Sequence, residues 1–504
     1  MELQSMQLFL VVFLTFFSLI WLVKQSRKFA KNRVYRKLPP GPWKLPVIGN
    51  LHNLAGSLPH HALRKLAQKY GPFMHLQLGK VSTLVVSSPK MAREVMKTHD
   101  ISFAQRPVLL APKIVTYNCA DLAFAPYGDH WRQMRKICIL ELLSKKRVLS
   151  FASIRENEVQ NLVESIRSSA GSPVNLTKKL LLLTSVITSR AAFGNQCKEH
   201  DEYLSMAKKV ISLAGGFDLA DLFPSNKFIQ LISRTRVELE RIHLEADKIL
   251  ESIIQQHQHK QIQINEPMEK DLVDVLLEVQ QSGSLEFPIT TDNIKAVVWD
   301  IFAAGTDTSS TTVDWAMAEM MKNPRVMEKA QAEVRQVFRG KQTIDETEVH
   351  NLSYLKLVIK ETLRLHPPVP LLLPRECRES CEIEGYKIPI KTKVIVNAWA
   401  IGRDPEHWHE AESFIPERFD NSLVDYKGTN FKYIPFGAGR RICPGISFGL
   451  VNVEFPLAQL LFHFNWELPS GMKPENLDMT ETFGAAVGRK NHLYLIATPF
   501  YSFK

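Results

Sequence analysis

The chain has 504 residues, 45% of them hydrophobic, which is enough to bury a large core. Its six cysteines are scattered, which excludes the disulfide-dense class of secreted proteins and favours a reducing compartment. The net charge of +11 does not indicate nucleic-acid binding, because seven Lys or Arg are concentrated in residues 24–37 and no basic, aromatic-interleaved stripe lies elsewhere.

The first predicted element is a membrane anchor. Residues 6–23 are apolar except for Gln7, Thr15 and Ser18, and they are about long enough to cross a bilayer as a helix. A core helix or a cleaved signal peptide would also be apolar, but Lys24 follows directly, without a small-residue cleavage site. The basic residues on the C-terminal side predict that the rest of the chain faces the cytosol. We therefore expect residues 1–23 to be a single-pass transmembrane helix.

A basic tether and a proline-rich hinge follow in residues 24–46, where four prolines hold the backbone extended. Residues 47–504 are predicted to form a single domain. Helical periodicity dominates from Pro89 to Pro367, and the polar residues 255–270 are expected to be a surface loop.

Strand patterns are few. Residues 74–88 alternate in polarity around Gly79 and Lys80 and predict a hairpin, and residues 386–399 are predicted to form another. A last strand is expected in residues 492–498. The fold class is therefore predicted to be mainly α with a small β-sheet region.

A polar run, residues 306–312, interrupts a long apolar helix that is expected to end at Pro324. Seven consecutive polar residues cover the whole circumference of a helix, so some of them must point inward. Threonines that donate to the carbonyl four residues back bend a helix, and Gly305 relieves crowding at the same place.

Two other spacings carry little information alone. Glu361 and Arg364 are three residues apart and can pair on one helix face. Cys377 and Cys381 are four apart, but no second Cys or His pair lies near them in the sequence to complete a tetrahedral zinc site.

The segment FGAGRRICPG, residues 436–445, sets Cys443 among glycines and arginines. A cysteine ligates metals as the thiolate, which the cations Arg440 and Arg441 and the start of the following apolar helix would favour. The glycines allow tight turns and the close approach of a flat partner. These residues alone leave open both a ligating thiolate and a buried structural cysteine.

This segment resembles the F-x-x-G-x-R-x-C-x-G signature of the cytochromes P-450, the haem-thiolate monooxygenases, at Phe436, Gly439, Arg441, Cys443 and Gly445. The resemblance implies a cytochrome P-450 fold that binds haem b, with Cys443 as the axial ligand of the haem iron and Phe436 beside the cofactor.

Residues 304–309, AGTDTS, match a second motif of the same family. The resemblance implies that Ala304 lies against the haem, that Thr308 holds the oxygen ligand and a water, and that Asp307 relays protons.

The remaining site residues also follow from the resemblance. Glu361 and Arg364 with Arg418, in the PERF segment, are similar to the ionic network that supports the haem side of the core in the family, where the loss of one member is strongly destabilising. The cations expected to bind the haem propionates are Arg441, Arg135 in the WRQMR segment with Trp131, Arg106 and Arg375.

The resemblance covers nearly the whole chain and is strongest to plant microsomal members that oxidise specialised metabolites, in particular terpenoids. It implies an endoplasmic reticulum membrane protein that uses O2 and electrons from an NADPH-dependent flavoprotein reductase to oxidise an apolar small molecule. Substrate-contacting segments are expected at residues 109–122, 211–221, 298–308, 369–373 and 483–487, which are mostly apolar.

Three alternatives remain open. The same chemistry could act on a flavonoid or an alkaloid. A haem-thiolate isomerase or dehydratase would need neither reductase nor O2, although Asp307 and Thr308 argue against it. A non-catalytic haem or sterol carrier would use the same pocket for binding alone.

Overall fold

The computed structural model describes residues 38–194, 199–263, 270–283 and 285–500. The predicted membrane anchor and nearly all of the basic tether lie outside the described residues.

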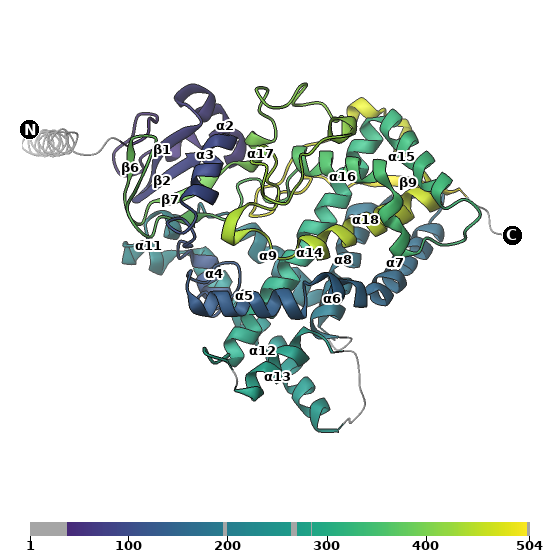
Figure 1. The fold of residues 1–504 in the computed structure, drawn as a ribbon, viewed down its shortest axis with the longest axis horizontal. Helices are drawn as coiled ribbons and strands as arrows, with labels where there is room; N and C mark the ends of the chain where they lie inside the picture. The colour runs from purple at the N-terminus through teal and green to yellow at the C-terminus, as the bar shows by residue number, and fades with distance from the viewer. Residues whose placement is uncertain (1–37, 195–198, 264–269, 284, 501–504) are drawn as a thin grey trace, which may run out of the picture.

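Helices make up most of the described chain, and Figure 1 shows them filling the body of the molecule beside a smaller sheet region. They are α2 (Pro59–Tyr70), α3 (Pro89–Arg93), α4 (Leu110–Val115), α5 (Asp129–Glu141), α6 (Lys145–Ser150), α7 (Ala152–Arg167), α8 (Leu176–Phe193), α9 (His200–Leu213), α10 (Leu219–Leu222), α11 (Lys227–Ile232), α12 (Arg234–Gln263), α13 (Leu272–Ser282), α14 (Thr291–Lys322), α15 (Pro324–Val337), α16 (Ser353–Leu365), α17 (Ala398–Ile401) and α18 (Ile446–His463).

The strands form three small sheets, with the orders β1-β2-β7-β4, β3-β9-β8 and β5-β6. Their bounds are β1 (Phe73–Leu78), β2 (Val81–Val86), β3 (Pro173–Asn175), β4 (Arg375–Glu376), β5 (Cys381–Ile383), β6 (Tyr386–Ile388), β7 (Lys393–Val396), β8 (Phe464–Glu467) and β9 (Tyr494–Pro499). The prediction of a mainly helical protein with a small sheet region is confirmed.

One of the two predicted hairpins is present. β1 and β2 pair antiparallel around a turn at Gly79, whose φ of 58° suits a residue without a side chain. The second prediction, a hairpin in residues 386–399, is wrong: β6 pairs with β5, whereas β7 pairs with β2 in parallel and with β4. A turn around Lys391, at φ 68°, directs the chain from one sheet to the other.

The polar segment 255–270 is also not a loop throughout. Helix α12 continues to Gln263, through the first residues of that segment. The buried His257 ties this part of the helix down, because its Nδ1 donates to Ile253 O at 2.7 Å and its Nε2 lies 2.8 Å from Asp271 Oδ2.

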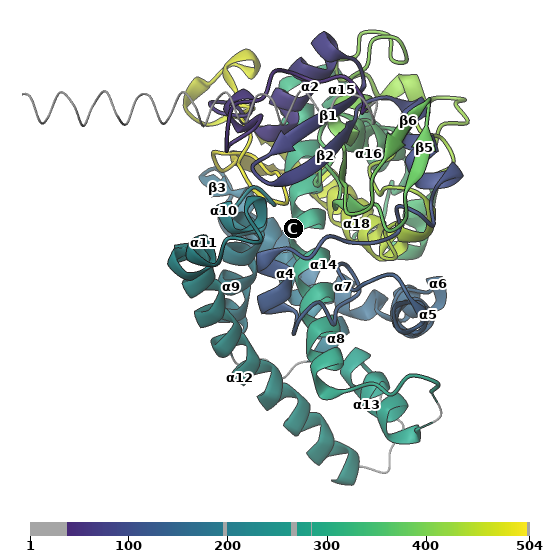
Figure 2. The same ribbon diagram turned by 90° about the vertical axis from the view of Figure 1, so that its left-hand side faces the viewer.

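Helix α14 runs through the centre of the molecule, which Figure 2 shows most clearly. It begins with a capping box between Thr290 and Asn293 and ends before Pro324, as predicted. It packs against α8, α9, α13, α15, α16 and α18. This helix therefore carries its polar run into the core.

Helix α18 follows the cysteine segment directly. Among the described residues it is the one helix long and apolar enough to cross a membrane, but it is mostly buried and packs against α7, α14, α15 and α16. It is therefore a core helix, and its packing on α14 brings Phe448 and Gly449 close to Gly305 and Ser309 of that helix.

Candidate active site

The cysteine segment makes two sharp turns before α18. Gly437 and Gly439 have φ values of 71° and 69°, and a Cβ on Gly439 would lie 2.1 Å from Met96 O. Gly445 has an ordinary φ of −93°, and its N–H points at the sulfur of Cys443. Two of the three glycines are thus required by the backbone, and the third brings a donor to the thiol.

Cys443 is half-buried at the start of α18. Burial raises the pKa of its thiol, while the Gly445 N–H and the guanidinium of Arg135 both act to lower it. The cation beside the sulfur is therefore Arg135, which donates to Ile442 O at 2.6 Å. The prediction that Arg440 is a cation beside the sulfur is wrong, because its side chain turns away and pairs with Asp100 at 3.6 Å.

The arginines predicted to bind propionates converge near this segment. Arg441 is buried, donates to Ala104 O and Ala125 O at 2.8 and 2.6 Å, and lies 4.1 Å from the ring centre of Trp131. Its Nη1 atom is buried without a hydrogen-bond partner in the described chain.

The other cations of this cluster are already engaged. Arg106 donates to Ala123 O and to the carbonyls of residues 373 and 374, at 2.8–2.9 Å. Arg375 donates to Ala438 O at 2.7 Å and pairs with Asp100 at 3.1 Å. The indole N–H of Trp131 donates a hydrogen bond to Leu122 O at 2.9 Å.

This cluster has an excess of positive charge. Burial, Arg375 and Arg135 together lower the pKa of Arg441 to about 9. Burial, Arg441 and Arg375 likewise lower the pKa of Arg106. Buried guanidinium groups that repel one another are stabilised by an anion. The orphaned Nη1 of Arg441 and this repulsion fit the carboxylates of a haem.

The middle of α14 packs against the start of α18, directly after the cysteine segment. Ala304 is exposed although α14 is a core helix, and Thr308 Oγ1 donates to Ala304 O at 2.6 Å. Gly305 is tightly packed, because a Cβ there would lie 3.0 Å from Thr188 Cγ2 and 3.4 Å from the ring of Phe448. The small side chains leave one face of α14 free for a flat ligand.

Asp307 lies beside Thr308 but faces differently. Burial raises the pKa of its carboxyl, and Lys208 of α9 opposes the rise. The thiol, the arginine cluster and this stretch of α14 are the parts that the structure brings together.

Glu361, Arg364 and Arg418 form one buried network. Arg364 donates to both carboxylate oxygens of Glu361, at 2.7 and 2.8 Å, and Arg418 donates to Oε1 at 2.9 Å. Both Glu361 and Arg364 side chains are 0% exposed. The remaining guanidinium donors of Arg364 bind the carbonyls of residues 402, 411 and 413. The network therefore joins α16 to the segment that leads toward the cysteine.

The sequence reasoning missed a carboxyl pair near the site. Asp300 of α14 accepts from the backbone N–H groups of Leu122 and Ala123 at 2.9 and 2.8 Å. Burial raises the pKa values of Asp300 and Asp121, that of Asp121 to about 6. An acid inside the apolar run VVWDIF was the available signal.

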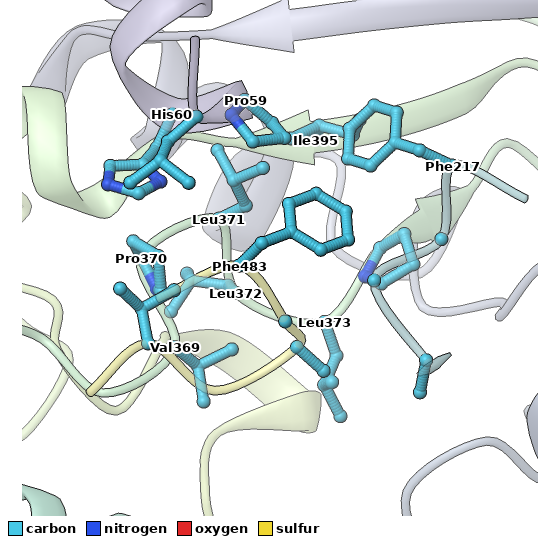
Figure 3. Close-up of a pocket in the computed structure, with 18 of the residues that line it drawn as sticks. Pro59, His60, Phe217, Val369, Pro370, Leu371, Leu372, Leu373, Ile395 and Phe483 are labelled. Carbon is cyan, nitrogen blue, oxygen red and sulfur yellow. The ribbon is translucent and has the colours of Figure 1, made fainter. Parts of the chain in front are cut away.

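An apolar pocket opens between the β1 sheet and the C-terminal loops, and Figure 3 shows Phe483 at its centre. Four of the five predicted substrate segments contribute to it: residues 109, 214–217, 369–373 and 483–487 excluding 486. The fifth segment, on α14, and Cys443 do not line it. The pocket nevertheless borders the arginine cluster, because its lining includes Leu373 and Pro374, whose carbonyls accept from Arg106.

Known proteins resemble this chain over nearly its whole length. The family model described as "Cytochrome P450" matches residues 39–496. The premnaspirodiene oxygenase of Hyoscyamus muticus is 57% identical over 98% of this chain and 99% of its own length. The desmethyl-deoxy-podophyllotoxin synthase of Sinopodophyllum hexandrum is 62% identical over 92% of both chains. A zebra fish cytochrome P-450 solved with abiraterone is 26% identical, with a TM-score of 0.76 over 88% of this chain and 99% of its own.

Proposed function

The chain belongs to the cytochrome P-450 family of monooxygenases, and we propose that it oxidises an apolar terpenoid at a haem held by Cys443. The observation that carries the proposal is the half-buried thiol of Cys443 beside a buried arginine cluster in which Arg441 keeps an unpaired donor.

Each part of the site has a role in holding the cofactor. Cys443 would ligate the iron, while Arg441 and Arg135 would bind the propionates and Phe436 and Ala304 would pack against the ring. Bound haem supplies the iron at which O2 is reduced and one oxygen atom is inserted into a C–H bond. The Gly445 N–H and Arg135 favour the thiolate form of the ligand.

The proton needed at the reacting oxygen would come through α14. The Thr308 hydroxyl donates its proton to Ala304 O, so its lone pairs can accept a hydrogen bond from a protonated ligand or a water. Burial raises the pKa of the Asp307 carboxyl, which favours its protonated form. We assign Thr308 to hold, and Asp307 to resupply, this proton.

The substrate class rests on the apolar pocket and on the relatives. Leucines, Phe217, Phe483 and Val369 dominate its lining, with few charged groups, which suits a hydrocarbon-like molecule (Figure 3). The name of the premnaspirodiene oxygenase denotes oxygen insertion into a diene. The desmethyl-deoxy-podophyllotoxin synthase supports a second candidate for the substrate class, a molecule related to podophyllotoxin rather than to a diene.

The membrane and the electron source are further parts of the proposal. Residues 1–23 would anchor the protein in the endoplasmic reticulum membrane, with the catalytic domain in the cytosol, and an NADPH-dependent flavoprotein reductase would supply electrons. Exposed apolar side chains at Trp43, Val47, Phe228 and Leu231 support contact with a membrane.

The test is a reconstitution of the full chain with such a reductase in membranes. The wild type should bind haem, show the red-shifted Soret absorption of a reduced carbon monoxide complex, and convert a member of a terpene panel with one oxygen atom added. The Cys443→Ala variant should lose both the absorption and the product. Full haem content and turnover in that variant would refute the assignment.

The same experiment separates the alternatives. Product formation without NADPH would indicate an isomerase or dehydratase, and a ligand-induced spectral shift without oxygen-dependent product would indicate a carrier. Turnover of a flavonoid, an alkaloid or a podophyllotoxin precursor, with no turnover of any terpene, would replace the terpenoid class.

A further inference from the structure

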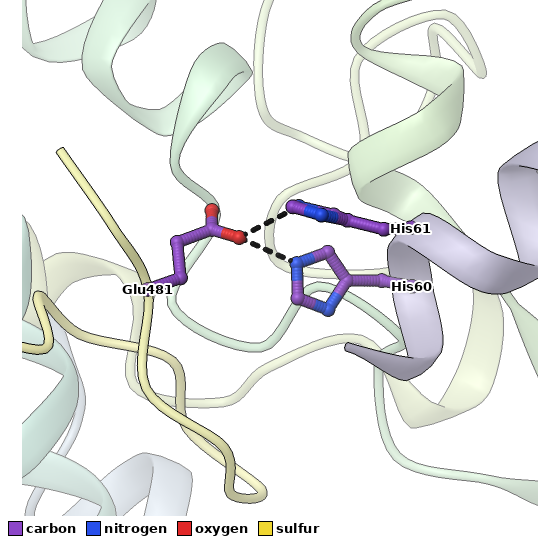
Figure 4. A group of neighbouring side chains, drawn as sticks. All are labelled: His60, His61 and Glu481. Carbon is purple, nitrogen blue, oxygen red and sulfur yellow. Dashed lines mark hydrogen bonds and ion pairs between the residues drawn. The ribbon is translucent and has the colours of Figure 1, made fainter. Parts of the chain in front are cut away.

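Two histidines and a glutamate meet away from the thiol site. His60 and His61 lie in the first turn of α2, and Glu481 lies between β8 and β9. Both Nε2 atoms lie 2.8 Å from the same carboxylate oxygen, Oε2 of Glu481, as Figure 4 shows. Residues adjacent on a helix diverge by about 100°, so two neighbouring imidazoles turned toward one oxygen form an unusual convergence.

The three donor atoms are close enough to share one metal ion. They all lie within 4.8 Å of one another. Zinc binds imidazole nitrogen and carboxylate oxygen at about 2.0–2.2 Å, so its ligands lie about 3.3 Å apart in a tetrahedron. The two 2.8 Å contacts would lengthen by about half an ångström, which side-chain rotation can supply. We propose that His60, His61 and Glu481 form a binding site for Zn²⁺ or a similar transition-metal cation.

The protonation states suit a metal. Burial lowers the pKa of His60 more than Glu481 raises it, so His60 is neutral at pH 7 and can offer a nitrogen lone pair. Burial acts against ionisation of Glu481, but the hydrogen bonds and charges of the two histidines outweigh it and hold its pKa below the ordinary value. The site therefore offers a neutral nitrogen from His60 and an anionic oxygen from Glu481, beside the imidazole of His61.

The site is open on one side. His61 and Glu481 line a polar pocket that also contains Trp399, and the side chain of His61 is 36% exposed. The rings of His61 and Trp399 are 4.4 Å apart, which fixes the imidazole. A metal would have water from this pocket as its fourth ligand, the arrangement of two histidines and one glutamate known for accessible zinc.

The neighbouring cations have a carboxylate of their own. Arg403 and Arg64 both lie over the Trp399 ring, and both pair with Glu412, at 3.0 and 2.6 Å. This carboxylate offsets one of the two charges, and Arg403 still acts on the cluster, where it lowers the pKa of His60. A lowered pKa keeps this imidazole neutral and leaves its lone pair available to a metal.

A metal here would fasten two parts of the apolar pocket. His60 lines that pocket, and Glu481 precedes residues 482–485, which also line it. Phe483 of this loop contacts the segment after α9, because a Cβ on Gly215 would lie 3.1 Å from its ring. Binding of the cation would therefore restrain a wall of the pocket.

The experiment measures zinc bound by the haem-loaded full chain. The protein is stripped with a chelator, dialysed against graded Zn²⁺, and analysed for metal per polypeptide by atomic spectrometry. The wild type should bind one more tight equivalent than the His61→Ala variant, whose affinity at this site should fall at least about 10-fold. A thousandfold excess of Mg²⁺ should not displace it, because imidazole ligands favour transition metals.

Two further variants make the result decisive. His409→Ala removes an imidazole that is 89% exposed, and it should bind zinc as the wild type does. Glu481→Gln keeps an oxygen that can accept from an imidazole but removes the anion, and it should lose the equivalent. Unchanged haem content and carbon monoxide absorption show that each variant is folded. Equal zinc binding by the wild type and by His61→Ala would show that the cluster is only a hydrogen-bonded contact, and would overturn the proposal.

Discussion

At the scale of single residues, the hydroxyl of Thr308 makes a sharp prediction. The Thr308→Ala variant should consume NADPH but form less product, because the site then lacks the hydroxyl that we assign to holding the proton. We expect the rate of product formation to fall about 10²-fold, the lower end of what a positioned proton donor contributes. Product and NADPH are measured together in the reconstituted system.

The matched control is Thr308→Ser, which keeps a hydroxyl able to bond to Ala304 O. It should retain most of the coupling between NADPH and product. Unchanged coupling in Thr308→Ala would instead show that the hydroxyl has only a helix-bonding role.

Single residues also show how far sequence reasoning reaches. Cys443 is singled out by the match of its neighbours to the family signature, because the turns and the helix start of such a segment lie next to the sulfur. The prediction that Arg440 is a cation beside this sulfur rests on its position in the same turn and is wrong: adjacency along a turn does not give direction, and Asp100 holds its side chain elsewhere. Arg135 reaches the sulfur environment from α5, through a contact with Ile442 O across 307 positions.

At the scale of elements, the Glu361 network holds α16 to the segment before the cysteine. Glu361→Gln would leave Arg364 and Arg418 buried without their anion, and we expect the free energy of unfolding to fall by about 3–5 kcal/mol. Denaturant titration followed by circular dichroism and haem absorbance would measure the loss.

Glu417→Gln is the comparison for this change. Glu417 lies one residue before Arg418 but binds Arg325 and Lys329, which are exposed, so its loss should cost less than about 1 kcal/mol. Similar costs for the two variants would contradict the view that burial makes the Glu361 network important.

At the scale of the whole molecule, Asp314 links three distant parts of the chain. Its carboxylate accepts from Thr177 of α8 at 2.6 Å and lies 3.8 Å from Arg489, near the C-terminal strand. Burial raises its pKa to about 6, partly opposed by these two partners. The folded state therefore favours the protonated form of Asp314 more than the unfolded state does.

Because the pKa of Asp314 is higher in the folded than in the unfolded state, its protonation stabilises the fold at a pH below the unfolded pKa. This contribution to the free energy of unfolding is lost as the pH rises through about 6. The Asp314→Asn variant keeps the acceptor for Thr177 and cannot ionise. Its stability relative to the wild type should thus increase between pH 4 and pH 7, by about 3 kcal/mol for a shift of two pKa units. A difference that stays constant with pH would show that Asp314 ionises normally; urea titrations across this range decide.

The sequence by itself determined the features that depend on neighbouring residues. The turn at Gly79, the proline end of α14 and the match of the cysteine segment to a haem-thiolate signature all followed from residues close together in the chain. These features are local because backbone conformation and helix termini are set within a few residues.

Only the tertiary structure decided which distant segments meet. β7 had several possible partners and pairs in parallel with β2, Asp300 binds a loop 178 positions away, and His60 meets Glu481 across 421 positions. Such contacts are selected by burial and by competition among alternative partners, so no short stretch of sequence specifies them.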